Sequence, residues 1–146
     1  MALEEMYQEL IVDHGRRPRN FGELPDATHS ARSYNPLCGD EIEISLRVQD
    51  GVIVQCKFTG CGCAISQAAA SLLTERVTGM KLEDAKQFFG RFRSAMVDGD
   101  VSESEALGEF VALLPVREYP MRVKCATLAG HTLIAALEHP KDAGNA

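Results

Sequence analysis

Several features that define other protein classes are missing from these 146 residues. Tryptophan is absent, and no apolar run approaches the roughly 18 residues that would cross a bilayer. The first residues, Met1-Ala2-Leu3-Glu4-Glu5, lack the basic start and apolar core of a signal peptide. No internal repeat or low-complexity tract is present. We therefore expect a cytoplasmic protein with no membrane partner.

An excess of positive charge is also missing, because the formal net charge is -6. Contacts to phosphates need clustered Lys and Arg, so this balance argues against nucleic acid as a partner. Hydrophobic residues make up 45% of the chain and charged residues 25%, which is ordinary for a globular protein. The length suits one domain with its own hydrophobic core. We predict a single domain over residues 1–138 and a short flexible tail over 139–146.

Alternating apolar residues predict a small antiparallel sheet in the first half of the chain. Residues 41–48 and 52–58 alternate as two strands, and Asp50-Gly51 between them favours a tight hairpin. A third strand is expected over residues 29–34. In the strand over 52–58, the alternation predicts that one face carries Val52, Val54, Cys56 and Phe58.

Helical spacing of apolar residues predicts helices on both sides of this sheet in the sequence. Ser102 and Glu105 have the spacing of a capping box, and Pro115 and Pro120 are expected to bracket an extended link. The order of elements predicts an α+β fold, in which about three antiparallel strands carry helices on one face. The predicted helices span residues 3–14, 64–78, 81–93, 103–113 and 124–138.

Five cysteines are the most informative residues: Cys38, Cys56, Cys61, Cys63 and Cys125. An odd number of cysteines in a reducing compartment indicates metal-binding or reactive thiols and not a disulfide framework. Cys56 lies in mid-strand on the apolar face, so we assign it to the core. The four histidines form no close pair, and each is interpreted as a surface or hydrogen-bonded residue.

Three cysteines and one aspartate fall at the ends of predicted elements. Cys38 and Asp40 flank Gly39 in the loop before a strand, Cys63 begins a helix, and Cys125 begins the last helix. Side chains at such positions can converge on one end of the fold, and Gly39 allows the backbone to turn between the first two.

The chemistry of this set favours a metal. Three thiolates with one carboxylate suit tetrahedral zinc or an iron–sulfur cluster. A helix N-terminus and the cations Arg122 and Lys124 beside Cys125 favour the thiolate form. Free cysteine is also a common core residue, so spacing alone supports a three-cysteine metal site and ordinary buried cysteines equally.

Three stretches of the chain, Asn35–Asp40, Phe58–Ser66 and Pro120–Leu128, resemble in this order the motifs of the SufU/IscU family of iron–sulfur cluster assembly proteins, related to the NifU N-terminal domain. The first is Asn35-Pro36-Leu37-Cys38-Gly39-Asp40. The second runs from Phe58 to Ser66 and includes Gly62-Cys63, and the third runs from Pro120 to Leu128 and includes Lys124-Cys125. Asp13-His14 and the Pro18-Arg19-Asn20 that follows also match. The resemblance covers nearly the whole chain and implies a SufU/IscU-like fold.

The resemblance implies that Cys38, Asp40, Cys63 and Cys125 are the metal ligands. IscU-like members are scaffolds for a transient [2Fe-2S] cluster, whereas SufU-like members hold zinc and accept sulfur from a pyridoxal-phosphate cysteine desulfurase. Lys124 stands where the IscU branch has histidine, and the spacer between the last two cysteines is longer, so the SufU branch matches better.

Cys61 is not part of the usual SufU pattern. It could be a relay thiol or a spare buried thiol, and we favour the spare thiol.

The function expected from these residues is that of a zinc-dependent sulfur acceptor of a SUF-type system, a sulfurtransferase-like accessory to a SufS/IscS-like desulfurase. Cys38 is the expected acceptor because it lies in a glycine-containing loop, and Asp40 is the expected adjustable ligand. The alternative is a non-catalytic scaffold holding iron as a [2Fe-2S] cluster, and a purely structural zinc is a third possibility. Downstream iron–sulfur assembly proteins are expected as further partners.

Overall fold

A computed structural model describes residues 3–36, 39–100, 102 and 104–140 of the chain. Leu37, Cys38 and residues 141–146 of the predicted tail therefore lie outside the described residues. In chain order, the elements are α1 (Leu3–Arg16), β1 (His29–Asn35), β2 (Asp40–Gln49), β3 (Val52–Cys61), α2 (Ala64–Val77), α3 (Leu82–Val97), the 3-10 segment η1 (Ser104–Glu118) and α4 (Pro120–Glu138).

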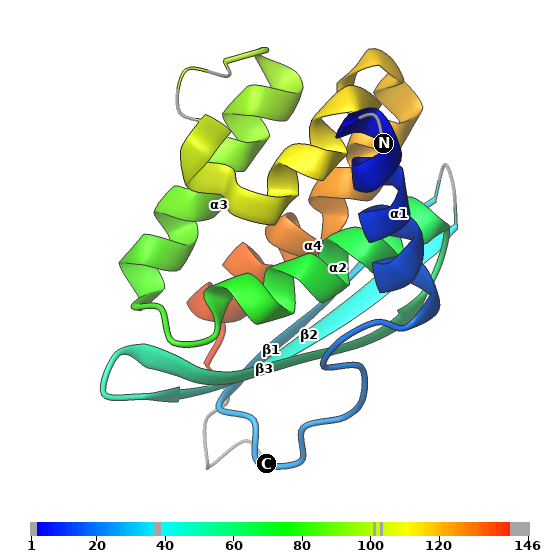
Figure 1. The fold of residues 1–146 in the computed structure, drawn as a ribbon. Helices are drawn as coiled ribbons and strands as arrows, with labels where there is room; N and C mark the ends of the chain where they lie inside the picture. Colours follow the sequence, from blue (N-terminus) through cyan, green and yellow to red (C-terminus); the bar gives the residue numbers. More distant parts are fainter. Residues whose placement is uncertain (1–2, 37–38, 101, 103, 141–146) are drawn as a thin grey trace.

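The three strands form one antiparallel sheet in the order β1-β2-β3, and the helices cover one of its faces (Figure 1). The α+β class and the single helix-bearing face are therefore confirmed. Asp50 and Gly51 both have positive φ, 54° and 76°, as the tight hairpin between β2 and β3 requires. Helices α2 and α4 lie against the sheet, and α1, α3 and η1 pack onto them (Figure 1).

The prediction for the inward face of β3 was wrong at its first half. Ile53 is fully buried, whereas Val52 and Val54 are only partly buried. The register between β2 and β3 shifts at Arg47/Val48, and such a β-bulge exchanges the two faces of a strand at that point. Beyond the bulge, Cys56 and Phe58 point into the core as predicted.

The C-terminal third also differs from the prediction. The 3-10 segment η1 continues through Pro115 to Glu118, so no extended link joins the two prolines. The Ser102 hydroxyl donates to Asp100 at 2.6 Å and does not form a capping box. Helix α4 begins at Pro120, because proline at a first helical position has no N–H to leave unpaired. Cys125 therefore lies in the second turn of α4 and not at its start.

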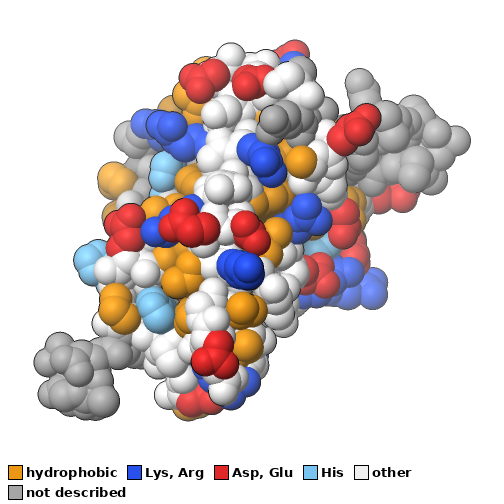
Figure 2. Space-filling view, turned by 90° about the vertical axis from the view of Figure 1, so that its left-hand side faces the viewer, with side chains coloured by type: hydrophobic (Ala, Val, Ile, Leu, Met, Phe, Trp, Pro, Cys, Tyr) orange, Lys and Arg blue, Asp and Glu red, His pale blue; other side chains and the backbone are white. Residues whose placement is uncertain are grey.

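Charged side chains of both signs are mixed on the face shown in Figure 2, where acidic, basic and hydrophobic groups are interspersed. The buried apolar side chains form a core cluster, with members from the strands and the helices. Among the described residues, no helix is both long enough and apolar enough to cross a bilayer.

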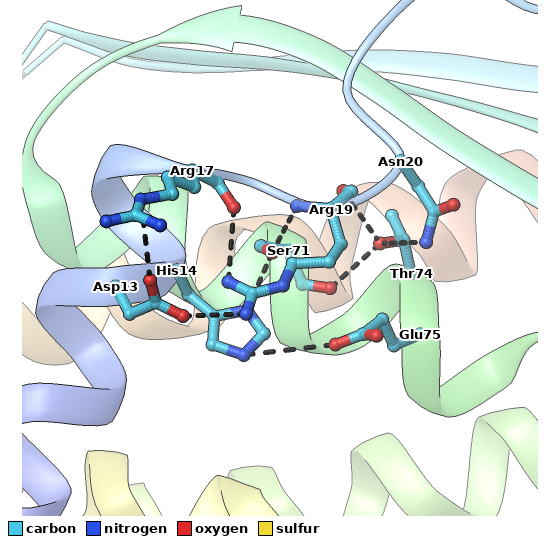
Figure 3. Close-up of polar contacts among 8 residues, drawn as sticks. All are labelled: Asp13, His14, Arg17, Arg19, Asn20, Ser71, Thr74 and Glu75. Carbon is cyan, nitrogen blue, oxygen red and sulfur yellow. Dashed lines mark hydrogen bonds and ion pairs between the residues drawn. The ribbon is translucent and has the colours of Figure 1, made fainter.

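A buried polar network joins the end of α1 to α2 (Figure 3). The Ser71 hydroxyl oxygen accepts the Arg19 backbone N–H at 2.7 Å and lies 2.7 Å from Nδ1 of His14. The Ser71 hydroxyl can donate to Nδ1 or accept from it, and Nε2 of His14 lies 3.8 Å from the Glu75 carboxylate. Asp13 completes the network by accepting from the Arg19 guanidinium at 2.6 Å.

This network predicts that the metal-free protein loses stability as the pH falls below about 6.5, the ordinary pKa of histidine. Burial, and then the positive charge of Arg19, lower the pKa of His14, although Glu75, Glu109 and Asp13 oppose this shift. The unfolded chain therefore binds more protons than the folded chain, and stability falls as pH drops from the unfolded pKa toward the folded one.

Urea denaturation between pH 7.5 and pH 5 measures this dependence. His14→Gln should flatten the slope of unfolding free energy against pH, because glutamine does not titrate. Glu75→Gln should steepen it, because a charge that favours protonated His14 is removed. Equal slopes in wild type and His14→Gln would contradict the assignment.

Candidate metal centre

The β1–β2 hairpin fixes the first part of the centre. Asn35 pairs with Asp40 in the strand register, and the Gly39 N–H donates to the Asn35 carbonyl at 2.8 Å. Gly39 has φ 74°, which is the left-handed turn expected of a glycine between the two predicted ligands. Asp40 is consequently the first residue of β2, and its side chain is fully buried.

Cys63 lies beside this carboxylate at the N-terminus of α2, where it is the N-cap residue. The Cys63 backbone N–H donates to Oδ1 of Asp40 at 2.8 Å, and the Cys63 sulfur lies 3.9 Å from Oδ2. A carboxylate is favoured here because the first N–H groups of a helix have no partner inside the helix. The bond to Oδ1 orients Asp40 so that Oδ2 faces the sulfur.

Cys125 completes the described group from α4. It is buried, and its sulfur lies 3.7 Å from the Met121 carbonyl oxygen one turn earlier. One ligand atom each from Asp40, Cys63 and Cys125 lies within 4.8 Å of the other two. Three donors that converge from three different elements, two of them sulfur, fit zinc or an iron–sulfur cluster. Cys38, the predicted fourth ligand, lies outside the described residues, so the full ligand set stays a prediction.

Arg122 supplies the positive charge of the centre. Attraction to the Cys63 thiolate and a hydrogen bond to it, followed by the same interactions with Cys125, raise the pKa of Arg122. One exposed guanidinium in the first turn of α4 is thus near enough to both sulfurs for each of them to raise its pKa. The sequence indicated this residue through its position before Cys125, whereas its contact with Cys63 depends on how α4 packs against α2.

An open groove of about 470 Å³ runs along the centre. Its lining is mainly apolar, and both Cys63 and Arg122 face it. The groove is lined by Cys63, Ala64, Ile65, Val116, Tyr119 and Arg122.

The two remaining cysteines lie apart from this group. Cys56 is 1% exposed, and burial raises its pKa to about 12, so its assignment to the core is confirmed. Cys61 is exposed, and the favoured description of it as a buried thiol was wrong. It pairs with Glu41 at the end of β3, one residue along from Asp40. Because side chains alternate along a strand, that row faces away from the core.

Gly62 was not singled out from the sequence, although it precedes Cys63 in the motif. A Cβ at Gly62 would collide with the Asp40 carboxylate and would lie 2.7 Å from the Ser66 hydroxyl oxygen. Glycine is therefore needed here for space, which no periodicity or composition indicates. Ser66 was quoted only as part of a motif, and it is 1% exposed beside the Cys63 sulfur.

We predict that Gly62→Ala lowers metal affinity at least as much as the loss of one ligand, because the added methyl group displaces Asp40. Metal titration of the variant, with circular dichroism to check the fold, measures this effect. The matched control is Gly90→Ala, since Gly90 has nothing within 4 Å of its Cβ position. Alanine in that helix should be neutral or stabilising by up to about 1 kcal/mol. Unchanged metal affinity in Gly62→Ala would show that the space is not required.

The chain is similar to known proteins over most of its length. The description "NifU-like N terminal domain" belongs to the family that matches residues 6–126. A Thermotoga maritima protein named iron–sulfur cluster assembly scaffold protein IscU is 39% identical, over 94% of this chain and 96% of the relative. The zinc-dependent sulfurtransferase SufU of Bacillus subtilis is 36% identical, over 90% of this chain and 88% of the relative.

A solved structure has the same fold. It is described as a candidate iron–sulfur cluster assembly scaffold for the SUF system of Fervidobacterium islandicum AW-1. The TM-score is 0.85 at 32% identity, covering 93% of this chain and 99% of the other. The chain therefore belongs to the family of the NifU-like N-terminal domain. Within that family, its relatives include both SufU and IscU proteins, as the three motifs indicated.

Proposed function

We propose that this protein is a zinc-dependent sulfur acceptor in iron–sulfur cluster assembly, with Cys38, Asp40, Cys63 and Cys125 as the zinc ligands. The observation that carries the proposal is the convergence of Asp40, Cys63 and Cys125 within 4.8 Å. The proposed sulfur donor is the persulfide of a pyridoxal-phosphate cysteine desulfurase in the cytoplasm. The sulfur then passes to further iron–sulfur assembly proteins.

The proposed reaction is thiol exchange at a sulfane sulfur. An acceptor thiolate attacks the outer sulfur of the donor's persulfide, a new S–S bond forms on the acceptor, and the S–S bond of the donor breaks. The electron pair of that bond stays on the donor's cysteine, which leaves as a thiolate, so no external oxidant or reductant is consumed. Zinc, when bound, keeps cysteine ligands deprotonated at neutral pH.

Each ligand has a distinct part in this proposal. Cys38 is the acceptor, because it precedes Gly39 in the chain between β1 and β2, whereas Cys63 caps α2 and Cys125 lies within α4. Asp40 is the adjustable ligand, since it is the one hard oxygen donor, and its Oδ1 stays bonded to the Cys63 N–H if Oδ2 leaves the metal. Cys63 and Cys125 hold the metal from helices and share the Arg122 guanidinium.

A scaffold function is the second candidate, and the relative from Thermotoga maritima that carries this name supports it. The same four ligands would hold a [2Fe-2S] cluster, and one carboxylate in place of a thiolate would weaken the hold and favour release. The two functions differ in whether sulfur first forms a persulfide on a cysteine of this chain.

Mixing the protein with a cysteine desulfurase and cysteine tests the proposal. The desulfurase should turn over faster, and alkylation followed by mass spectrometry should find persulfide on Cys38. Cys61→Ser is the matched control and should behave as wild type, because Cys61 lies outside the ligand group. Persulfide on Cys61 would make that thiol the acceptor. Persulfide on no cysteine, with an unchanged desulfurase rate, would favour the scaffold.

A further inference from the structure

A buried hydroxyl lies next to one of the two described sulfurs. Ser66 is in the first turn of α2 and is 1% exposed. Its hydroxyl donates to the Cys63 carbonyl oxygen at 3.0 Å, and its oxygen lies 3.9 Å from the Cys63 sulfur, close enough to accept from the protonated thiol. Both hydrogen-bond contacts found for Ser66 in the described part of the chain are therefore with Cys63.

The contact with the carbonyl is dispensable. The Cys63 carbonyl oxygen already accepts the Gln67 backbone N–H at 3.1 Å, which is the ordinary bond of the first helical turn. If the Ser66 proton turns away from that oxygen, no buried carbonyl is left unpaired. A Cys63 thiolate has no proton to donate, so the Ser66 hydroxyl, which is 1% exposed and shielded from water, can donate to the sulfur instead.

The position of this hydroxyl is fixed from the other side as well. The Ser66 oxygen and Oδ1 of Asp40 occupy the space that a side chain at Gly62 would fill. Oδ1 in turn accepts the Cys63 N–H at 2.8 Å. Gly62 thus leaves room for both oxygens. Oδ1 holds the Asp40 carboxylate in place through its bond with the Cys63 N–H, and the Ser66 oxygen lies beside the Cys63 sulfur.

We propose that Ser66 is a positioning residue whose hydroxyl donates a hydrogen bond to the Cys63 thiolate. This bond keeps Cys63 a metal ligand and not a sulfur acceptor. This inference rests on the proposed sulfur-acceptor function. A hydrogen bond from a neutral donor withdraws electron density from a thiolate and makes it a weaker nucleophile. The Arg122 guanidinium acts on the same sulfur in the same direction. Sulfur transfer is then directed away from Cys63.

The test compares the reactivity of each cysteine in zinc-loaded protein, without any desulfurase. Wild type, Ser66→Ala and Ser66→Thr are alkylated with iodoacetamide at saturating zinc, and mass spectrometry follows each site. Alkylation of Cys63 should be several-fold faster in Ser66→Ala and should return to the wild-type rate in Ser66→Thr, which keeps the hydroxyl. The matched control is Thr132→Val, because Thr132 is also a buried hydroxyl that donates to a carbonyl of its own helix, at 2.8 Å, but lies in α4 far beyond Cys125.

A second readout uses the sulfur itself. With desulfurase and cysteine present, Ser66→Ala should carry persulfide on Cys63 that wild type lacks. An unchanged rate of Cys63 alkylation in Ser66→Ala would overturn the inference. Loss of zinc from that variant at saturating metal would also overturn it, because it would show that Ser66 has a purely structural role. If wild type forms no persulfide at all, the proposed function fails, whereas the alkylation rates still decide the part played by Ser66.

Discussion

Replacing Cys63 or Cys125 with alanine is expected to empty the metal centre, whereas Cys56→Ala is expected to leave it full. The first two sulfurs converge with Asp40 within 4.8 Å, and Cys56 lies in the core. Each of the Cys63 and Cys125 variants keeps only three of the four proposed ligands, which is too few to close a tetrahedral shell. Cys38→Ala should act like the ligand variants, because the family resemblance assigns Cys38 to the same shell.

The same variants should also differ in how much zinc raises their thermal stability. Metal that binds only the folded chain adds folding free energy, about 2.7 kcal/mol at a metal concentration 100 times the dissociation constant. Wild type should therefore melt several degrees higher with zinc than without it, and Cys63→Ala and Cys125→Ala should show almost no such increase. Cys56→Ala should keep the full increase while losing about 1–2 kcal/mol of core packing.

Metal analysis after gel filtration, together with thermal melts, measures both effects. Cys56 is the suitable control because it is as buried as Cys125, at 1% exposure each. A Cys56→Ala protein without metal, alongside a Cys63→Ala protein that keeps it, would overturn the ligand assignment.

Asp40→Ala is expected to destabilise the metal-loaded protein much more than the metal-free protein. Asp40 is fully buried, and the cost of burying a carboxylate offsets much of what its hydrogen bond with the Cys63 N–H contributes to stability. The metal-free variant should therefore be nearly as stable as wild type, even though the Cys63 N–H loses its acceptor. With metal, the variant should gain much less stability than wild type, because three thiolates remain but the oxygen ligand is gone.

Asp40→Asn separates the two contributions of this side chain. Asparagine can still accept the Cys63 N–H, which Asp40 accepts at 2.8 Å, but it is a poorer ligand than a carboxylate. Desulfurase assays on both variants test the adjustable role. Stimulation of the desulfurase by Asp40→Ala equal to that of wild type would count against it.

The fold was largely predictable because its elements carry clear periodic signals. Ile42, Ile44 and Leu46 alternate inward in β2 as the pattern requires, and all three are fully buried. The bulge at Arg47/Val48 was not predictable, since nothing in the composition of the two strands marks where the register shifts. The segment that forms η1 was predicted as a short helix followed by an extended link, because proline disfavours the interior of an α-helix. The structure instead continues through Pro115 as a 3-10 helix, whose tighter turns accommodate the proline.

The residues of the site, like the elements of the fold, were predictable only in part. Asp40, Cys63 and Cys125 were identified from motifs and element ends, and the structure brings these three together. Gly62 matters because a carboxylate approaches it closely, and Ser66 matters because its hydroxyl is buried beside the Cys63 sulfur. Such contacts depend on how the β1–β2 hairpin packs against the start of α2, which local sequence does not determine.

The central claim is that these residues form a thiolate-rich zinc centre, and X-ray absorption at the zinc edge of protein purified without oxygen tests it most directly. We predict a colourless protein with one zinc per chain, and a first shell of about three sulfurs near 2.3 Å with one oxygen near 2.0–2.2 Å. A protein without stoichiometric zinc, or zinc bound only by oxygen and nitrogen, would contradict the account. A brown protein with iron and sulfide in equal amounts would replace the zinc acceptor with the cluster scaffold.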